Sequence, residues 1–419
     1  MNKKIKKWYK LDNAAKIFPP TSTKKDPKVF RISCELYEDV DGRFLQEALN
    51  LTIEEYPMFL SSLKKGLFWY YLETASVVPK VEEEKTLICD NMDPSLLFRV
   101  SYYKKRINLE MHHALTDGTG TIFFIKSLVT NYLESKYNIK DKILVDNSSI
   151  FEKESNSFEK YYKKMRKLEI PKGKSAYNLK GNRYPEERLK VIEGVLPMDK
   201  VLSCSKDYNT TVTIYLVSVL IKSIASNMSR REKRKPIVIT VPVNLRKYFK
   251  SNTARNFFST INISYKSKND NEKLEDIINC VSNQFEENLN KEKLDRQMND
   301  LALLENLFVI RIVPLFVKNL VLKYFHLRDK KNQTMTLSNI GIIEMPKELQ
   351  KYVKLFDVMA STDKTQLCMC SYLNKMVLTF TTHFVDTEIE KNFFKELNSG
   401  DTEIMINDNV VEDSYEEVL

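Results

Sequence analysis

The residues best suited to chemistry lie between Met111 and Gly118, in the sequence Met-His-His-Ala-Leu-Thr-Asp-Gly. The chain of 419 residues contains only four histidines, and two of them, His112 and His113, are adjacent here. A neutral imidazole can remove a proton from a reacting group near neutral pH, which is the task of a general base. Paired imidazoles close to Asp117 and Gly118 therefore indicate an active site.

The flanking patterns place this segment in a loop between a strand and a helix. Residues 98–103 and 107–111 have the pattern of two strands, joined by a turn at 104–106. After Gly118, apolar side chains recur at helical spacing up to Leu133. Loops held by rigid elements commonly display catalytic groups. We therefore expect both histidines at the exposed end of a strand.

Strand and helix patterns alternate along the rest of the chain. The predicted strands are 29–36, 67–72, 191–196, 236–243, 261–263, 334–341, 367–372 and 375–381, and the predicted helices are 44–53, 211–225 and 272–299. We expect the aromatic strand 67–72 to lie in the core, and helix 211–225, apolar on nearly all sides, to be buried.

Length and composition indicate a globular protein with two domains. A chain of 419 residues suits two cores of roughly 200 residues each. Residues 134–184 are charged and punctuated by Pro and Gly, which predicts the crossing between domains, with a surface helix within 158–168. We place the domains at 1–180 and 181–419. The acidic residues 401–419 predict a solvated, partly disordered end.

Several classes of protein are disfavoured by the sequence. Nine glycines are few, and neither GxxxxGK[ST] nor GxGxxG occurs, which argues against a glycine-rich phosphate loop. The six cysteines are scattered and the remaining histidines have no metal-ligand spacing, so we expect reduced thiols, no metal and a cytoplasmic protein. The basic run 229–236 lacks interleaved aromatics, which favours a solvated turn over a nucleic-acid site.

No membrane span or export signal is expected. The N-terminus is basic, but no apolar run of signal-peptide length follows it. The longest apolar region, 301–325, is interrupted by Glu305, Arg311, Pro314 and Lys318. We interpret it as a core or lid helix. Peripheral membrane contact is the alternative, because basic residues accompany its apolar ones.

The motif at 112–118 resembles that of the CoA-dependent acyltransferase superfamily, whose members share His-His-x-x-x-Asp-Gly. This superfamily includes chloramphenicol acetyltransferase, the plant BAHD acyltransferases, condensation domains and alcohol acetyltransferases. The resemblance extends to Val241–Arg246 and Leu337–Gly341, and it is greatest to the bacterial alcohol-acetyltransferase-like branch. The plant motif Asp-Phe-Gly-Trp-Gly is absent. The resemblance implies an α/β fold with two similar subdomains, largely antiparallel mixed sheets flanked by helices, and a tunnel between them.

The resemblance also implies roles for the motif residues. His113 would be the general base and would return the proton to the departing CoA thiolate, with no acyl-enzyme and no cysteine or serine nucleophile. His112 would orient the loop or contact the substrate. Asp117, which need not face His113, would form a structural brace with Arg246, a partly buried pair that suits a bidentate geometry. Gly118 would leave room for substrate and let the backbone turn.

Donors for the substrate are expected in the second subdomain. Ser338 and Asn339 stand at a predicted strand end, from which they could face His113 across a cleft and contact the oxyanion or CoA. The alternative is that this loop is only structural.

Three functions remain open from the sequence. The first is transfer of an acyl group, most simply acetyl, from acyl-CoA as co-substrate to an alcohol, with no tightly bound cofactor. The second uses an acyl carrier protein as donor or an amine as acceptor. A net charge of +10 would suit either CoA or an acidic carrier protein. The third is a binding protein of the same fold, without activity.

Overall fold

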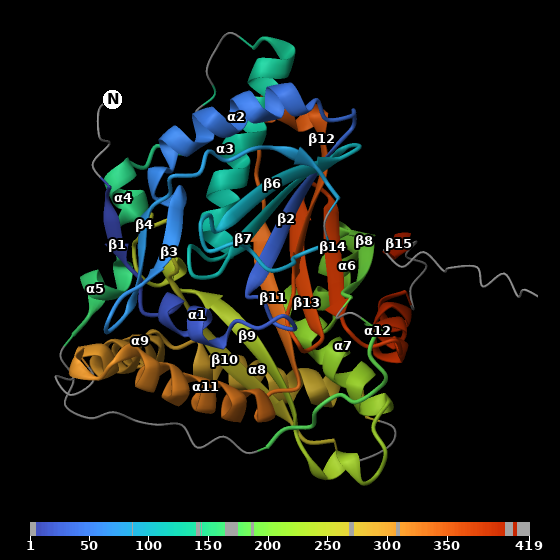
Figure 1. Ribbon diagram of the computed structural model, residues 1–419. Helices are drawn as coiled ribbons and strands as arrows, with labels where there is room; N and C mark the ends of the chain where they lie inside the picture. Colours follow the sequence, from blue (N-terminus) through green and yellow to red (C-terminus); the bar gives the residue numbers. More distant parts are fainter. Residues whose placement is uncertain are drawn as a thin grey trace, which may run out of the picture.

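Two sheets, each covered by helices, form the framework of the computed structural model (Figure 1). It describes residues 6–85, 87–139, 143, 145–163, 175–185, 188–267, 272–306, 311–398 and 405–408, with the side chains of 301–306 and 408 left out. The expected α/β fold, with mixed and largely antiparallel sheets flanked by helices, is confirmed. Parts of the predicted crossing 134–184 and most of the tail 401–419 lie outside the described residues.

The first sheet has five strands in the order β12-β2-β7-β6-β5. Their bounds are β2 Val29–Leu36, β5 Glu82–Glu83, β6 Phe98–Tyr103, β7 Arg106–His112 and β12 Val353–Ala360. The helices α2 (Gly42–Glu55) and α3 (Gly118–Tyr137) pack against each other and share one apolar core with this sheet. Because β12 comes from the second half of the sequence and pairs with β2, the two lobes are joined by a strand exchange.

The second sheet has seven strands in the order β10-β9-β11-β13-β14-β8-β15. Their bounds are β8 Lys190–Pro197, β9 Ile237–Asn244, β10 Phe258–Tyr265, β11 Met335–Ile342, β13 Gln366–Tyr372, β14 Lys375–Thr382 and β15 Met405–Asp408. The helices of this lobe are α6 Met198–Asp207, α7 Val212–Ser226, α8 Leu274–Asn288, α9 Lys291–Asn306, α11 Leu315–Lys331 and α12 Glu388–Leu397. Every residue of β13 is buried, because both faces of the sheet are covered.

Smaller elements complete the described fold. A third sheet has the order β1-β4-β3, with β1 Trp8–Lys10, β3 Ser61–Lys65 and β4 Tyr70–Thr74. The short helices are α1 Phe18–Thr21, α4 Ile150–Glu154 and α5 Ser157–Tyr161, and the 3-10 turns are η1 Ala15–Ile17, η2 Pro57–Phe59, η4 Glu232–Arg234, η5 Leu245–Lys247 and η6 Lys347–Tyr352. Among the described helices, no single one could cross a membrane by length and apolar character.

One prediction about an element was wrong in part. Of the predicted core strand 67–72, only 70–72 lie in a strand, β4. Leu67 and Phe68 are exposed in the turn between β3 and β4, which the hydrogen bond from Gly66 N to Trp69 O closes at 3.0 Å. Within the end segment predicted to be solvated and partly disordered, Met405–Asp408 forms β15 and pairs with β8. The turn at 66–69 belongs to the local hairpin of β3 and β4, whereas β15 depends on pairing with the distant strand β8.

Candidate active site

The histidine pair lies where β7 ends and before α3 begins, as the sequence predicts. His112 is 6% exposed and uses both ring nitrogens. Its Nδ1 accepts the Ala114 N–H at 3.0 Å, so the ring proton is on Nε2, which lies 3.3 Å from Ser22 Oγ. Burial, followed by the neighbouring His113 and Lys28, lowers the pKa of His112 to about 3. A neutral His112 therefore shapes the loop.

The His113 ring contacts aromatic side chains from three segments. It stacks on Phe18 of α1 at 4.8 Å between centroids, lies 4.4 Å from Phe30 of β2, and lies 6.4 Å from Phe258 of β10. Its main-chain N–H donates to Lys28 O at 2.8 Å. Since Phe30 and Phe258 belong to different sheets, His113 lies between the two lobes.

The electrostatics of His113 favour a neutral ring. Burial lowers its pKa to about 4, and the Asp117 carboxylate and the Thr116 carbonyl only partly oppose this. Its Nδ1 is buried and, among the described residues, has no partner at hydrogen-bonding geometry. The residue as a whole remains partly exposed. At neutral pH the imidazole is thus in the form that can accept a proton.

Asp117 is fully engaged away from the imidazole. Its Oδ2 accepts from Arg246 Nη1 and from the Phe257 N–H, both at 2.8 Å. Its Oδ1 accepts from Arg246 Nη2 at 3.2 Å and from the Gly120 N–H at 3.0 Å, so that Asp117 also caps the N-terminus of α3. The carboxylate therefore does not form a catalytic triad with His113.

Arg246 connects the two lobes at this point. It follows β9 in η5, and the predicted pair with Asp117 is present, with the Arg246 and Asp117 side chains 6% and 7% exposed. Its guanidinium also donates to Thr253 O at 3.0 Å and to Arg255 O. The pair thus holds the loop of the first lobe against residues 253–257 of the second.

Other residues that fix the loop were not identified from the sequence. Thr116 Oγ1 donates to Ala254 O at 2.6 Å, and Asn256 Nδ2 donates to His113 O at 3.0 Å. A Cβ on Gly120 would lie 2.1 Å from Ala254 O, so only glycine fits there. The sequence contains a clue to this close approach. Glycine is uncommon in this chain but occurs at both 118 and 120, around the predicted start of the helix.

The expected role of Gly118 is corrected in part. Among the described glycines only Gly341 has a positive φ, so the turn at Gly118 does not require glycine. A Cβ at Gly118 would instead meet Ile340 Cδ1 of β11 at 2.6 Å. The residue allows β11 to come close to the loop.

Ser338 and Asn339 point to opposite faces of β11, so the structure does not bring both toward His113. Their partners in β13 are Cys368, which belongs to the core of the first lobe, and Met369, which belongs to the core of the second. Asn339 Nδ2 donates to Thr213 Oγ1 of α7 at 2.8 Å, and its Oδ1 accepts from the Gly341 N–H. Asn339 therefore has a structural position, and Ser338 is on the side of the first lobe.

Other chemical groups in the described residues do not suggest a second type of centre. No group of three or more His, Cys, Asp or Glu in that part of the chain could hold a metal. All six cysteines are free thiols. Burial raises the pKa of Cys368 to about 12 and also raises the pKa of Cys370 well above its usual value, so neither is a reactive thiolate.

No protein-family model matches this chain, and no curated protein matches it significantly. Solved structures do match. Polyketide synthase associated protein 5 from Mycobacterium tuberculosis has a TM-score of 0.61 at 12% identity, with 93% of this chain and 96% of that chain covered. TRI3 trichothecene 15-O-acetyltransferase from Fusarium sporotrichioides has a TM-score of 0.61 at 10% identity, covering 94% of each chain.

A third match is the starter condensation domain of rhizomide synthetase RzmA, solved in complex with C8-CoA and Leu-SNAC. Its TM-score is 0.59 at 9% identity, with 93% of each chain covered. These similarities span nearly the whole described fold at identities too low to transfer activity. The chain therefore has the two-lobed fold that these acetyltransferase and condensation-domain structures share.

Proposed function

We propose that this protein is an acyltransferase that moves an acyl group from a CoA thioester to an alcohol, with His113 as general base. The observation that carries the proposal is the neutral His113 imidazole, which contacts aromatic side chains of both lobes and lies in a loop braced by Asp117 and Arg246. The similar structures include a named O-acetyltransferase and a domain solved with C8-CoA.

The proposed reaction follows from the protonation state of His113. Nε2 takes the hydroxyl proton while the acceptor oxygen bonds to the thioester carbonyl carbon, and Nδ1 keeps its own proton. When the tetrahedral intermediate breaks its C–S bond, the imidazolium gives the proton to the CoA sulfur. No enzyme nucleophile is needed.

Thiol release from a panel of acyl-CoAs, with and without alcohols and amines, tests the proposal. We expect release that depends on an alcohol and falls by at least about 100-fold in His113→Ala, the scale of a lost general base. Equal rates for wild type and His113→Ala would overturn the proposal. Turnover only with an acylated carrier protein would instead support the condensation-type alternative, which the similarity to a condensation domain keeps open.

The matched control is His112→Asn. An Asn Oδ1 can accept the Ala114 N–H in place of the His112 Nδ1, so the loop is expected to keep its shape and much of the activity. A variant as inactive as His113→Ala would assign His112 a direct catalytic role.

A further inference from the structure

The helix α11 exposes several large apolar side chains to solvent. Phe316, Leu320, Tyr324 and Leu327 follow one another at helical spacing along its outer side, and each is between 61% and 66% exposed. A contiguous exposed apolar patch is unusual on a protein that functions alone in water.

Polar side chains hold the inner side of α11 on the protein. Lys318 Nζ donates to Phe68 O at 2.9 Å and lies 3.7 Å from the centroid of the Trp69 ring. Lys330 Nζ lies 2.9 Å from the Asp26 carboxylate. Since these contacts attach the helix, its outer apolar side chains are not needed for packing within this lobe.

The turn between β3 and β4 extends the apolar surface. Leu67 is 73% exposed, and its carbonyl accepts the Leu315 N–H at 2.9 Å, which joins the turn to the start of α11. Phe68 in the turn and Ile312 before the helix are also exposed. We define the docking face as residues 67–68, 312 and the outer side of α11.

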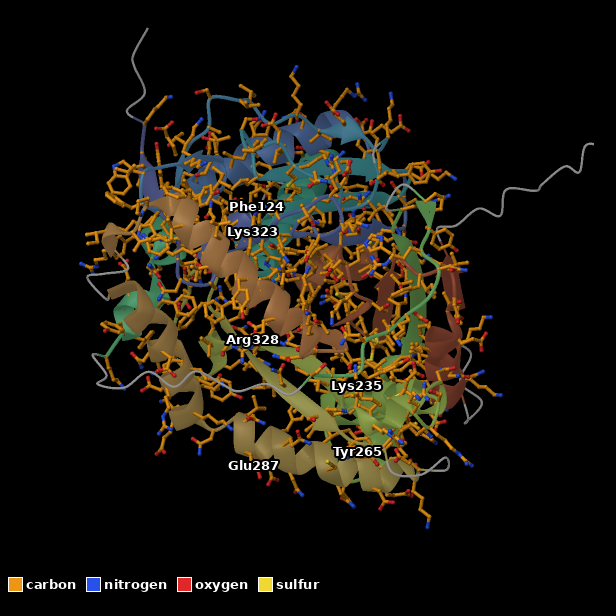
Figure 2. All side chains as sticks on the ribbon, turned by 60° about the horizontal axis from the view of Figure 1, so that its bottom comes forward. Phe124, Lys235, Tyr265, Glu287, Lys323 and Arg328 are labelled. Atoms are coloured by element: carbon orange, nitrogen blue, oxygen red, sulfur yellow. The ribbon has the colours of Figure 1, made fainter. Side chains whose placement is uncertain are left out.

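The charge on this face is positive. Lys323, Arg328 and Lys331 are exposed on α11, against one exposed acid, Asp329 (Figure 2 labels Lys323 and Arg328 along the helix). Apolar and aromatic side chains among exposed cations complement a bilayer surface with anionic headgroups.

We propose that the docking face binds the surface of an anionic phospholipid bilayer. Side chains such as Phe316 and Leu320 enter the interfacial region, and the exposed cations contact lipid phosphates. The face is close to the candidate active site, because α11 packs on α1, whose Phe18 stacks on His113. Docking does not depend on the proposed acyl transfer, since it is measured without turnover.

Sedimentation of the full chain with vesicles tests this proposal. We expect binding to phosphatidylcholine vesicles that contain phosphatidylglycerol, weaker binding to phosphatidylcholine alone, and loss of the difference at high salt. The double variant F316S with L320S should bind at least about tenfold more weakly, since it removes two apolar side chains. The double variant K323E with R328E should lose the preference for anionic vesicles.

Matched controls come from exposed residues outside the docking face. F151S on α4 replaces a side chain that is 82% exposed, and K200E with K206E on α6 makes an equal change of charge. Both should bind vesicles like wild type, and all variants should unfold like wild type because the altered side chains are exposed. Absence of wild-type binding, or equal loss in the controls, would overturn the proposal. A wild-type dimer that F316S with L320S converts to monomer, without vesicle binding, would show instead that a second copy covers the face.

Discussion

Replacement of Arg246 by alanine tests whether the contact between the lobes supports the catalytic loop. The substitution leaves the buried Asp117 carboxylate without its cation, and the loss of one partner of a buried pair costs about 3–5 kcal/mol. Asp117 would keep the Gly120 and Phe257 N–H donors, which favours the lower end of this range. The carbonyls of Thr253 and Arg255 would lose a donor as well, which adds to the cost.

Denaturant unfolding, combined with hydrogen exchange of single amides, measures this effect. We expect a lower free energy of unfolding and faster exchange at the Gly120 and Phe257 amides, because their acceptor is Asp117. The control His113→Ala should abolish activity but leave the Gly120 and Phe257 amides protected, because Asp117 and Arg246 keep their contacts. The reasoning is refuted if Arg246→Ala unfolds within about 1 kcal/mol of wild type and both amides keep their protection.

Three further predictions concern the same loop. The pKa of His113 is lowered to about 4, so kcat/KM for thiol release should fall only as the pH approaches 4; an acid limb near 6.5 would contradict the assignment. Folding lowers the pKa of His112 from 6.5 to about 3, so its contribution to stability is present above pH 6.5 and is lost as the pH falls. Since His113 contributes to the same loss, denaturant unfolding between pH 7 and 5 should show a loss that is smaller by roughly 2 kcal/mol in His112→Asn than in wild type. Gly120→Ala should lower the free energy of unfolding by about 1–3 kcal/mol, since the added Cβ meets the main chain of Ala254. Gly118→Ala should lower it by less, since the end of the Ile340 side chain can move. Equal losses for the two variants in thermal or denaturant unfolding would show that these close approaches do not matter.

Local periodicity was sufficient for most elements. The strands that end at His112 and Asn244, and the helix that follows Gly118, lie within a few residues of the predicted ranges. The prediction that Ser338 and Asn339 both face His113 overlooked the alternation of side chains along a strand. Adjacent residues of one strand face opposite sides of the sheet, so only one of the two could face His113. The contact between Asp117 and Arg246 could be predicted because each is in a motif that the resemblance pairs.

The sequence by itself determined where the histidine pair lies, between a strand and a helix, because alternation and helical spacing are local properties. Only the tertiary structure decided what surrounds His113, since Phe18, Phe30 and Phe258 come from three separate segments. It also decided that β12 returns to the first sheet and that α11 turns its apolar side outward. The local sequence pattern indicates which side chains lie on the same face of a strand or helix. Which element packs against that face depends on contacts between distant parts of the chain.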